Sequence, residues 1–96
     1  MVNLSELIKN GALLIDLRTA AEFEQEHIPG SLNIPFESLN SKLLKSNFIK
    51  FRKKEIVITC SGNALESAVA KDMLLSQGML HVHDGGIWKD LQNSLS

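Results

Sequence analysis

The segment EIVITCSGNA, residues 55–64, decides the fold of this chain. Its first half is apolar and β-branched, which is typical of a buried central strand, here Glu55–Thr59, that ends at Cys60. A short loop with a glycine follows, and a helix is then expected over Ala64–Gln77 until Gly78 ends it. A strand, a short loop and a helix in this order predict one unit of a parallel α/β sheet. The residues expected to line the buried side of this helix are Leu65, Val69, Met73 and Leu74.

Strands and helices alternate along the rest of the chain. Thr19, with Glu22 three residues later, is predicted to cap one helix, and Asn3 is predicted to cap another. In chain order, the other expected elements are helix Leu4–Lys9, strand Ala12–Leu17, helix Ala20–Glu26, strand Leu32–Ile34, a helical region Pro35–Ser46, an exposed basic segment Phe48–Lys54, strand Leu80–His83, a turn at Gly85-Gly86 and helix Ile87–Asn93. The pattern predicts a three-layer α/β fold, with a mostly parallel central sheet and helices on both of its faces.

Composition limits the classes of function. The chain has 96 residues, 44% of them hydrophobic, which predicts a single domain over residues 1–96. Its 10 basic and 11 acidic residues give no reason to expect a nucleic acid or a membrane as a partner. A single cysteine excludes an internal disulfide and a multi-cysteine zinc site. The chain start does not resemble a signal peptide, so we expect a cytoplasmic protein, or a periplasmic one if a signal peptide was removed.

Cys60 is the candidate reactive residue. It stands at the carboxyl end of the predicted central strand, where ligands bind in open parallel sheets. Ser61, Gly62 and Asn63 then lead into a helix, so that backbone N–H groups and the positive end of the helix dipole face one point. Such surroundings stabilise a thiolate or a persulfide, whereas cysteine in general is most often an inert buried side chain. The context favours a functional thiol.

Three ordered motifs of this chain resemble those of rhodanese-like domains. The first is LIDLR at residues 14–18, followed by Glu22-Phe23, and the second is HIPGSLNIP at residues 27–35. The strand that ends in Cys60, the loop residues Gly62-Asn63 and then Gly85-Gly86 continue the match in the same order. The resemblance covers most of the chain, is strongest to the short single-domain forms, and implies the rhodanese-like fold.

The resemblance also implies a sulfurtransferase activity. Cys60 would be the catalytic residue and would carry sulfur as a persulfide, taken from a small donor such as thiosulfate or another persulfide. The acceptor would be cyanide or a thiol, with a protein thiol as a further candidate. The substrate-binding residues would be Ser61, Gly62, Asn63, Ala64 and Leu65, whose amides would surround the outer sulfur. Structural support would come from Asp16, Arg18 and His27, and no cofactor or metal is implied.

The charge of the loop departs from the family pattern. Many members carry arginine directly after the cysteine or later in the loop, where this chain has Ser61, Ala64 and Leu65. No lysine or arginine occurs over residues 55–70, and Glu66 is acidic and close by. A nearby carboxylate costs a dianion such as thiosulfate roughly 1 kcal/mol across a few ångströms of water. Backbone amides alone would then hold an anionic donor.

Other functions for the same residues have weaker support. A cysteine phosphatase needs the pattern Cys-x5-Arg, and the arginine position is occupied here by Glu66. Asp16 and His27 suggest a Cys-His-Asp relay, but their places in the motifs favour structural hydrogen bonding. The basic run over residues 50–54 favours a solvated loop over a docking patch for an acidic partner.

A metal site near the end of the chain is also a weak candidate. His81, His83 and Asp84 lie close together, but strand alternation places Val82 inward and both imidazoles on the surface. No fourth ligand accompanies them.

Trp88, farther on, is expected to belong to the core.

Two classes of function remain open. One is the enzyme, and the other is a binding or sensing module of the same fold that docks a partner with little or no turnover. The cysteine and its glycine-containing loop favour the enzyme, whereas the missing loop arginines favour the module. Sulfur uptake by Cys60, measured by intact mass after treatment with thiosulfate, separates the two.

Overall fold

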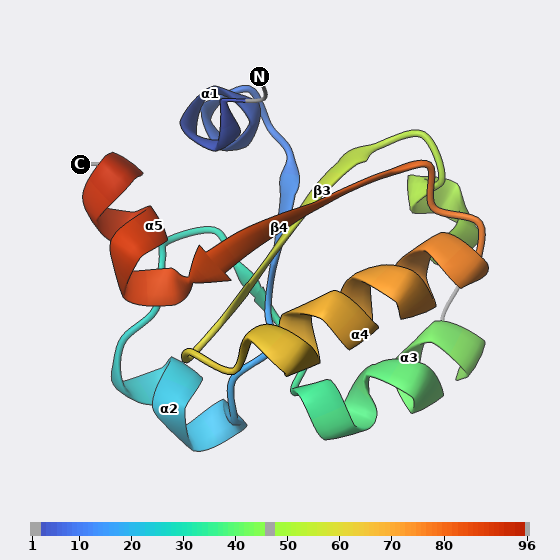
Figure 1. Ribbon diagram of the computed structural model, residues 1–96, viewed down its shortest axis with the longest axis horizontal. Helices are drawn as coiled ribbons and strands as arrows, with labels where there is room; N and C mark the ends of the chain where they lie inside the picture. Colours follow the sequence, from blue (N-terminus) through green and yellow to red (C-terminus); the bar gives the residue numbers. More distant parts are fainter. Residues whose placement is uncertain (1–2, 46–47, 96) are drawn as a thin grey trace.

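A computed structural model describes residues 3–45 and 48–95 of the chain as alternating strands and helices (Figure 1). The elements are α1 (Leu4–Lys9), β1 (Leu13–Asp16), α2 (Ala20–Gln25), β2 (Leu32–Asn33), the 3-10 helix η1 (Phe36–Ser38), α3 (Leu39–Lys45), the 3-10 helix η2 (Phe48–Phe51), β3 (Glu55–Cys60), α4 (Ala64–Ser76), β4 (His81–Ile87) and α5 (Trp88–Leu95). The strands form a four-stranded sheet in the order β2-β1-β3-β4, and each neighbouring pair is parallel. This confirms the expected parallel α/β sheet.

Helices cover both faces of the sheet, as predicted (Figure 1). Because successive strand residues point to opposite faces, Ile56 and Ile58 of β3 face one layer while Val57 faces the other. The first layer contains α3 and α4, whose Leu39 and Leu74 are fully buried against the sheet. The second layer contains α1 and α5, and its buried members are Leu14, Ile28, Val57 and Leu91.

The predicted helix caps are present. The Thr19 hydroxyl accepts a hydrogen bond from the Glu22 amide at 3.2 Å, and the Glu22 carboxylate accepts one from the Thr19 amide at 3.2 Å. This reciprocal capping box begins α2 at the expected residue. The side chain of Asn3 accepts from the Glu6 amide and begins α1 in the same way.

The buried side of α4 differs from the predicted stripe. Leu74 is buried and Met73 packs against the core, as expected, but Leu65 is 72% exposed and Val69 is 39% exposed. The residues that α4 buries are Ser67, Ala70 and Leu74, which lie at helical spacing on a neighbouring side of the helix. Hydrophobicity alone therefore placed Leu65 and Val69 on the wrong side of the helix. Small residues face the sheet instead, where α4 packs on β3 and β4.

The predicted turn at Gly85-Gly86 is part of β4 instead. The register shifts between Ile58 and Cys60, so that β4 carries an extra residue there, and Gly86 has a φ of 73°. A Cβ atom at Gly85 would lie 2.7 Å from the carbonyl oxygen of Ile58. The absence of a side chain at Gly85 thus permits close pairing, and the strand continues through a bulge rather than turning.

The segment after α3 is predicted to be exposed, and this is correct for its charged residues and for Ile49 but not for its two phenylalanines. Lys50 is exposed, but Phe48 is 6% exposed and belongs to the core. The rings of Phe48 and Phe51 meet edge to face with centroids 5.3 Å apart, and Phe51 packs on the same core. The end of the predicted preceding helix, Ser46, lies outside the described residues. Within the described residues, no helix is long and apolar enough to cross a membrane.

Candidate active site

Cys60 is the last residue of β3 and is only 3% exposed. Its side chain nevertheless lines a cavity of about 140 Å³ at the carboxyl end of the sheet. The volume exceeds the roughly 30 Å³ that one water molecule occupies in the liquid, so the cavity has room for a small sulfur-bearing group. The residues that line it are Cys60, Gly62, Ala64, Ser67, Asp84, Gly86 and Ile87.

Two oxygen atoms lie near the sulfur of Cys60. Its Sγ lies 3.6 Å from the carbonyl oxygen of Gly86 and 3.9 Å from the hydroxyl oxygen of Ser67. The same Gly86 carbonyl accepts a hydrogen bond from the Thr59 hydroxyl at 2.8 Å. The thiol can therefore donate to either oxygen, and the bulge in β4 brings one of them within reach.

A short polar chain connects this sulfur to a carboxylate. The Ser67 hydroxyl lies 3.2 Å from Oδ2 of Asp84, as it does from the carbonyl oxygen of Ala64. The Gly86 amide donates to Oδ1 of Asp84 at 2.9 Å. Ser67 is 1% exposed, whereas Asp84 is exposed. This series of polar contacts therefore leads from the buried sulfur to the surface.

The expected loop residues divide into two groups. Gly62 and Ala64 line the cavity, and Gly62 has a φ of 140°, which favours glycine. Ser61, Asn63 and Leu65 are exposed and are not among the lining residues.

Some of the backbone amides that were expected to surround the outer sulfur bind a side chain instead. The side chain of Asn63 accepts from the amides of Leu65 and Glu66, at 3.1 and 3.2 Å, and so caps α4. Two amides at the start of this helix therefore bind the cap instead of facing the sulfur.

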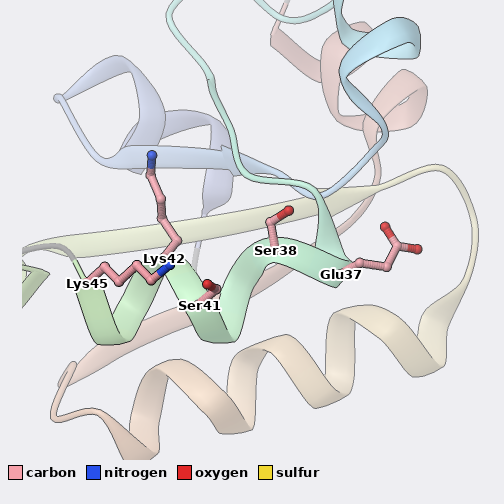
Figure 2. Close-up of a pocket in the computed structure, with 5 residues that line it drawn as sticks. All are labelled: Glu37, Ser38, Ser41, Lys42 and Lys45. Atoms are coloured by element: carbon pink, nitrogen blue, oxygen red, sulfur yellow. The ribbon is translucent and has the colours of Figure 1, made fainter.

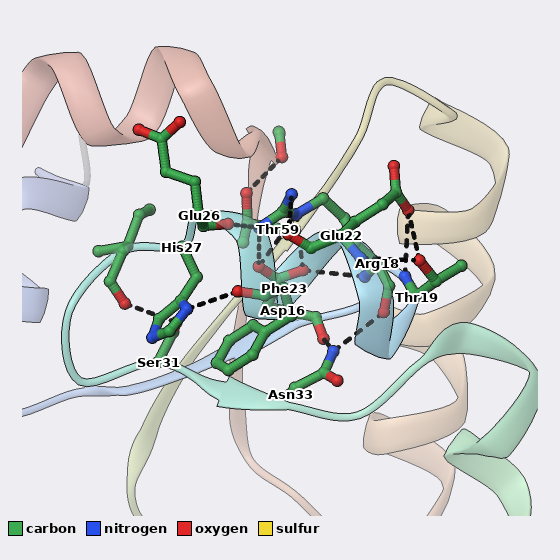
Figure 3. A network of polar contacts seen from close by, with 12 residues as sticks. Asp16, Arg18, Thr19, Glu22, Phe23, Glu26, His27, Ser31, Asn33 and Thr59 are labelled. Atoms are coloured by element: carbon green, nitrogen blue, oxygen red, sulfur yellow. Dashed lines mark hydrogen bonds and ion pairs between the residues drawn. The ribbon is translucent and has the colours of Figure 1, made fainter.

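The Asp16–Arg18 pair is buried beside the strand that carries Cys60 (Figure 3). Asp16 pairs with Thr59 across the sheet, and its Oδ2 lies 3.0 Å from Nη2 of Arg18. The same nitrogen donates to the carbonyl oxygen of Glu26 at 2.7 Å, and the guanidinium lies 4.0 Å from the centroid of the Trp88 ring. Arg18 therefore links β1 to the end of α2 and the beginning of α5.

His27 contacts Phe23 rather than the cavity. Its Nδ1 donates to the carbonyl oxygen of Phe23 at 2.6 Å, and the two rings stack with centroids 3.8 Å apart (Figure 3). Within the described part of the chain, the Asp16 carboxylate pairs with Arg18 and makes no hydrogen bond to His27. These contacts give no Cys-His-Asp relay through Cys60.

The two histidines of β4 have different surroundings. His81 is exposed, and His83 lies 2.7 Å from the carboxylate of Glu55 on β3. Val82 is buried between them, as strand alternation predicts. Across residues 3–45 and 48–95, no three His, Cys, Asp or Glu side chains lie close enough together to hold a metal ion.

A larger hollow of about 430 Å³ lies along α3, away from the cysteine (Figure 2). Its lining residues are Glu37, Ser38, Ser41, Lys42 and Lys45. They come from η1 and α3 alone and include no nucleophilic thiol or buried charged group. The smaller cavity at Cys60 is therefore the candidate active site.

Sequence reasoning missed part of the cavity lining. Ser67 was not singled out, and Asp84 was considered only as a metal ligand. A signal for Ser67 exists, because it lies three residues after Ala64 and thus on the same side of the helix start. Asp84 directly precedes the Gly85-Gly86 motif, but its position beside Ser67 depends on the pairing of β4 with β3, in which Asp84 lies opposite Ile58.

Comparison with known proteins shows which sequences and solved structures this chain is similar to. Thiosulfate sulfurtransferase PspE of Escherichia coli K12 is 27% identical over 77 residues, which are 80% of this chain and 71% of that protein. Thiosulfate sulfurtransferase GlpE of Pseudomonas savastanoi pv. phaseolicola is 34% identical over 88 residues, which are 86% of this chain and 77% of that protein. The human single-domain sulfurtransferase TSTD1 superposes with a TM-score of 0.77 at 25% identity, covering 97% of this chain and 92% of that one.

The family profile extends over nearly the whole chain. The profile of the Rhodanese-like domain matches residues 2–91, which include β1, the Cys60 loop and β4. The sequence match, the parallel sheet and the structural superposition point to the same family. This chain belongs to the rhodanese-like domain family.

Proposed function

We propose that this protein is a sulfurtransferase that carries sulfane sulfur as a persulfide on Cys60. The observation that carries the proposal is the position of Cys60, the one cysteine of the sequence, in a cavity at the carboxyl end of β3. Membership of the rhodanese-like family supports it, as do relatives named as thiosulfate sulfurtransferases.

The reaction consists of two displacements at sulfur. The Cys60 thiolate attacks the outer sulfur of a donor such as thiosulfate, a new S–S bond forms, and sulfite leaves with the electron pair of the broken S–S bond. Cyanide or a thiolate then attacks the outer sulfur of the persulfide, and the electron pair of the second broken bond returns to Sγ. The products are thiocyanate or a new persulfide, together with the original thiolate.

The residues around the cavity have separate tasks in this proposal. Gly62 leaves space for the outer sulfur, and the Ser67 hydroxyl, 3.9 Å from Sγ, can accept from the thiol or donate to a thiolate. The partial positive charge at the start of α4 stabilises negative sulfur. Asp16, Arg18 and His27 support the fold around the loop, through the contacts that hold α2 to β1.

Replacement of Cys60 tests the mechanism. Cys60→Ser is expected to fold and to form no thiocyanate from thiosulfate and cyanide, because it removes the sole thiol. The wild type should gain the mass of one sulfur atom after treatment with thiosulfate or inorganic polysulfide, and the variant should not. Activity of Cys60→Ser near that of the wild type would contradict the persulfide mechanism.

The second candidate is a binding module with little or no turnover. It is favoured by one observation, namely that the lining of the cavity contains the Asp84 carboxylate and no lysine or arginine among the described residues. A folded wild type that takes up no sulfur from either donor would support the module over the enzyme.

A further inference from the structure

The Cys60 cavity carries a negative charge at its lining. Asp84 is the one charged side chain among the lining residues in the part of the chain that the structure describes. It belongs to none of the ion pairs found there. The sequence has no lysine or arginine over residues 55–70, so the loop and the start of α4 supply no cation to offset this charge.

The Asp84 carboxylate is held in place beside the sulfur. Its Oδ1 accepts from the Gly86 amide at 2.9 Å, and its Oδ2 lies 3.2 Å from the Ser67 hydroxyl. That hydroxyl is 3.9 Å from the Sγ of Cys60. One hydroxyl group therefore separates the carboxylate from the reacting sulfur, and the hydrogen bond from the Gly86 amide keeps the charge oriented toward the cavity.

Glu66, the acidic residue that lies close to Cys60 in the sequence, does not line the cavity. It is half-buried in the first turn of α4. Any effect of local charge on the substrate is therefore expected to come mainly from Asp84.

We infer that Asp84 is a specificity-determining residue, which favours sulfur carriers with a cationic group beside the reacting sulfur over anionic carriers. The inference rests on the proposed function. In the second displacement, the acceptor thiolate forms an S–S bond to the outer sulfur, the bond to Cys60 breaks, and its electron pair stays on Sγ. An ammonium group two carbons from the acceptor sulfur is attracted by the Asp84 carboxylate, whereas a carboxylate in a similar position is repelled.

Three small thiols of similar size test the inference. The full chain is loaded with sulfur from inorganic polysulfide, freed of excess donor, and mixed with cysteamine, 2-mercaptoethanol or 3-mercaptopropionate. The loss of one sulfur mass gives each rate, for the wild type and for Asp84→Asn. Because each thiol is compared between the two proteins, its intrinsic reactivity cancels.

The expected results differ in sign among the thiols. Measured against its effect on the neutral thiol 2-mercaptoethanol, Asp84→Asn should slow cysteamine about fivefold and speed 3-mercaptopropionate about fivefold, as removal of one charge at a few ångströms predicts. Asp72→Asn, the loss of an exposed carboxylate farther along α4, should change none of the three rates. An equal effect of Asp84→Asn on all three thiols would overturn the inference.

Two further measurements keep the test decisive. The variant retains an oxygen for the Gly86 amide, and its melting curve shows whether it folds. If it does not fold, the salt dependence of the wild-type rates provides the test. Higher salt should slow the reaction with cysteamine and speed the reaction with 3-mercaptopropionate. Rates without that salt dependence would then overturn the inference. Failure of Cys60 to take up sulfur overturns the proposed function as well, whereas persulfide formation without charge discrimination overturns this inference alone.

Discussion

The residue that follows Cys60 is an exposed serine, next to a cavity whose lining contains a carboxylate. An arginine at this position would bring a full positive charge to the loop, where backbone amides supply only partial charge. Relatives with arginine in this loop would then differ from this chain in how they hold an anionic donor, and not in the reaction at sulfur.

Ser61→Arg should therefore improve the use of thiosulfate. We expect its KM for thiosulfate to fall roughly fivefold at low salt, which corresponds to about 1 kcal/mol, and the gain to shrink as salt rises. Ser61→Gln is the matched control, because it introduces a long polar side chain without a charge. Its KM for thiosulfate should change little. A KM that is equal in all three proteins would show that charge beside Cys60 does not limit thiosulfate binding.

At the scale of single elements, β4 depends on a glycine that sequence analysis assigned to a turn. A Cβ atom at Gly85 would lie 2.7 Å from the Ile58 carbonyl oxygen and 2.8 Å from Cγ1 of Val57. These atoms belong to the central strand and cannot move away easily. The bulge that brings the Gly86 carbonyl to the sulfur therefore requires glycine at residue 85.

Gly85→Ala is expected to destabilise the fold by about 3 kcal/mol through this overlap. Gly30→Ala is the control, because a Cβ atom there would meet nothing within 4 Å and only the φ of 85° is unfavourable, at a cost of about 1 kcal/mol. Urea unfolding of both variants measures the difference. If Gly85→Ala is no less stable than Gly30→Ala, the proposed close packing of β3 and β4 is wrong.

The capping box of α2 makes part of the stability depend on pH. A hydrogen bond from the Thr19 amide, and then one from its hydroxyl, hold the pKa of Glu22 below its usual value. A carboxylate with a lowered folded pKa contributes stability above its unfolded pKa of about 4.3, and this contribution is lost as the pH falls through the folded pKa.

The stability difference between the wild type and Glu22→Gln should follow that pH dependence. We expect it to be present at about pH 6 and to shrink as the pH falls through the lowered folded pKa of Glu22. Urea unfolding at a series of pH values measures it. Glu24→Gln, which changes an exposed carboxylate of the same helix, should not reproduce this trend. A difference that is constant with pH would contradict the role of the capping box.

At the scale of the whole molecule, Arg18 connects segments that are far apart in the chain. It pairs with Asp16 of β1 and donates to the end of α2 (Figure 3). Its guanidinium also lies over the Trp88 ring at the start of α5. The side chains of the pair are only 4% and 1% exposed. Removal of one partner therefore leaves a buried charge without its counterion.

Arg18→Met should cost about 3–5 kcal/mol of unfolding free energy, and the double variant Asp16→Asn/Arg18→Met should lose less than Arg18→Met alone. The exposed pair of Lys89 and Glu26 provides the comparison, and Lys89→Met should change stability by less than about 1 kcal/mol. Chemical denaturation of the four proteins gives these values. Equal losses from Arg18→Met and Lys89→Met would show that the buried pair does not stabilise the packing of α2 and α5.

Local sequence by itself determined the order of strands and helices, the caps of α1 and α2, and the place of Cys60 at the end of a buried strand. These features depend on side-chain period and on contacts a few residues apart, which the sequence displays directly. The tertiary structure alone decided which side of α4 faces the sheet, because small Ser67 and Ala70 pack there while Leu65 stays exposed. It also decided that Asp84 lies beside the sulfur, since this depends on how β4 pairs with β3. Helix rotation and strand register are set by packing between segments distant in the chain, and no local pattern specifies them.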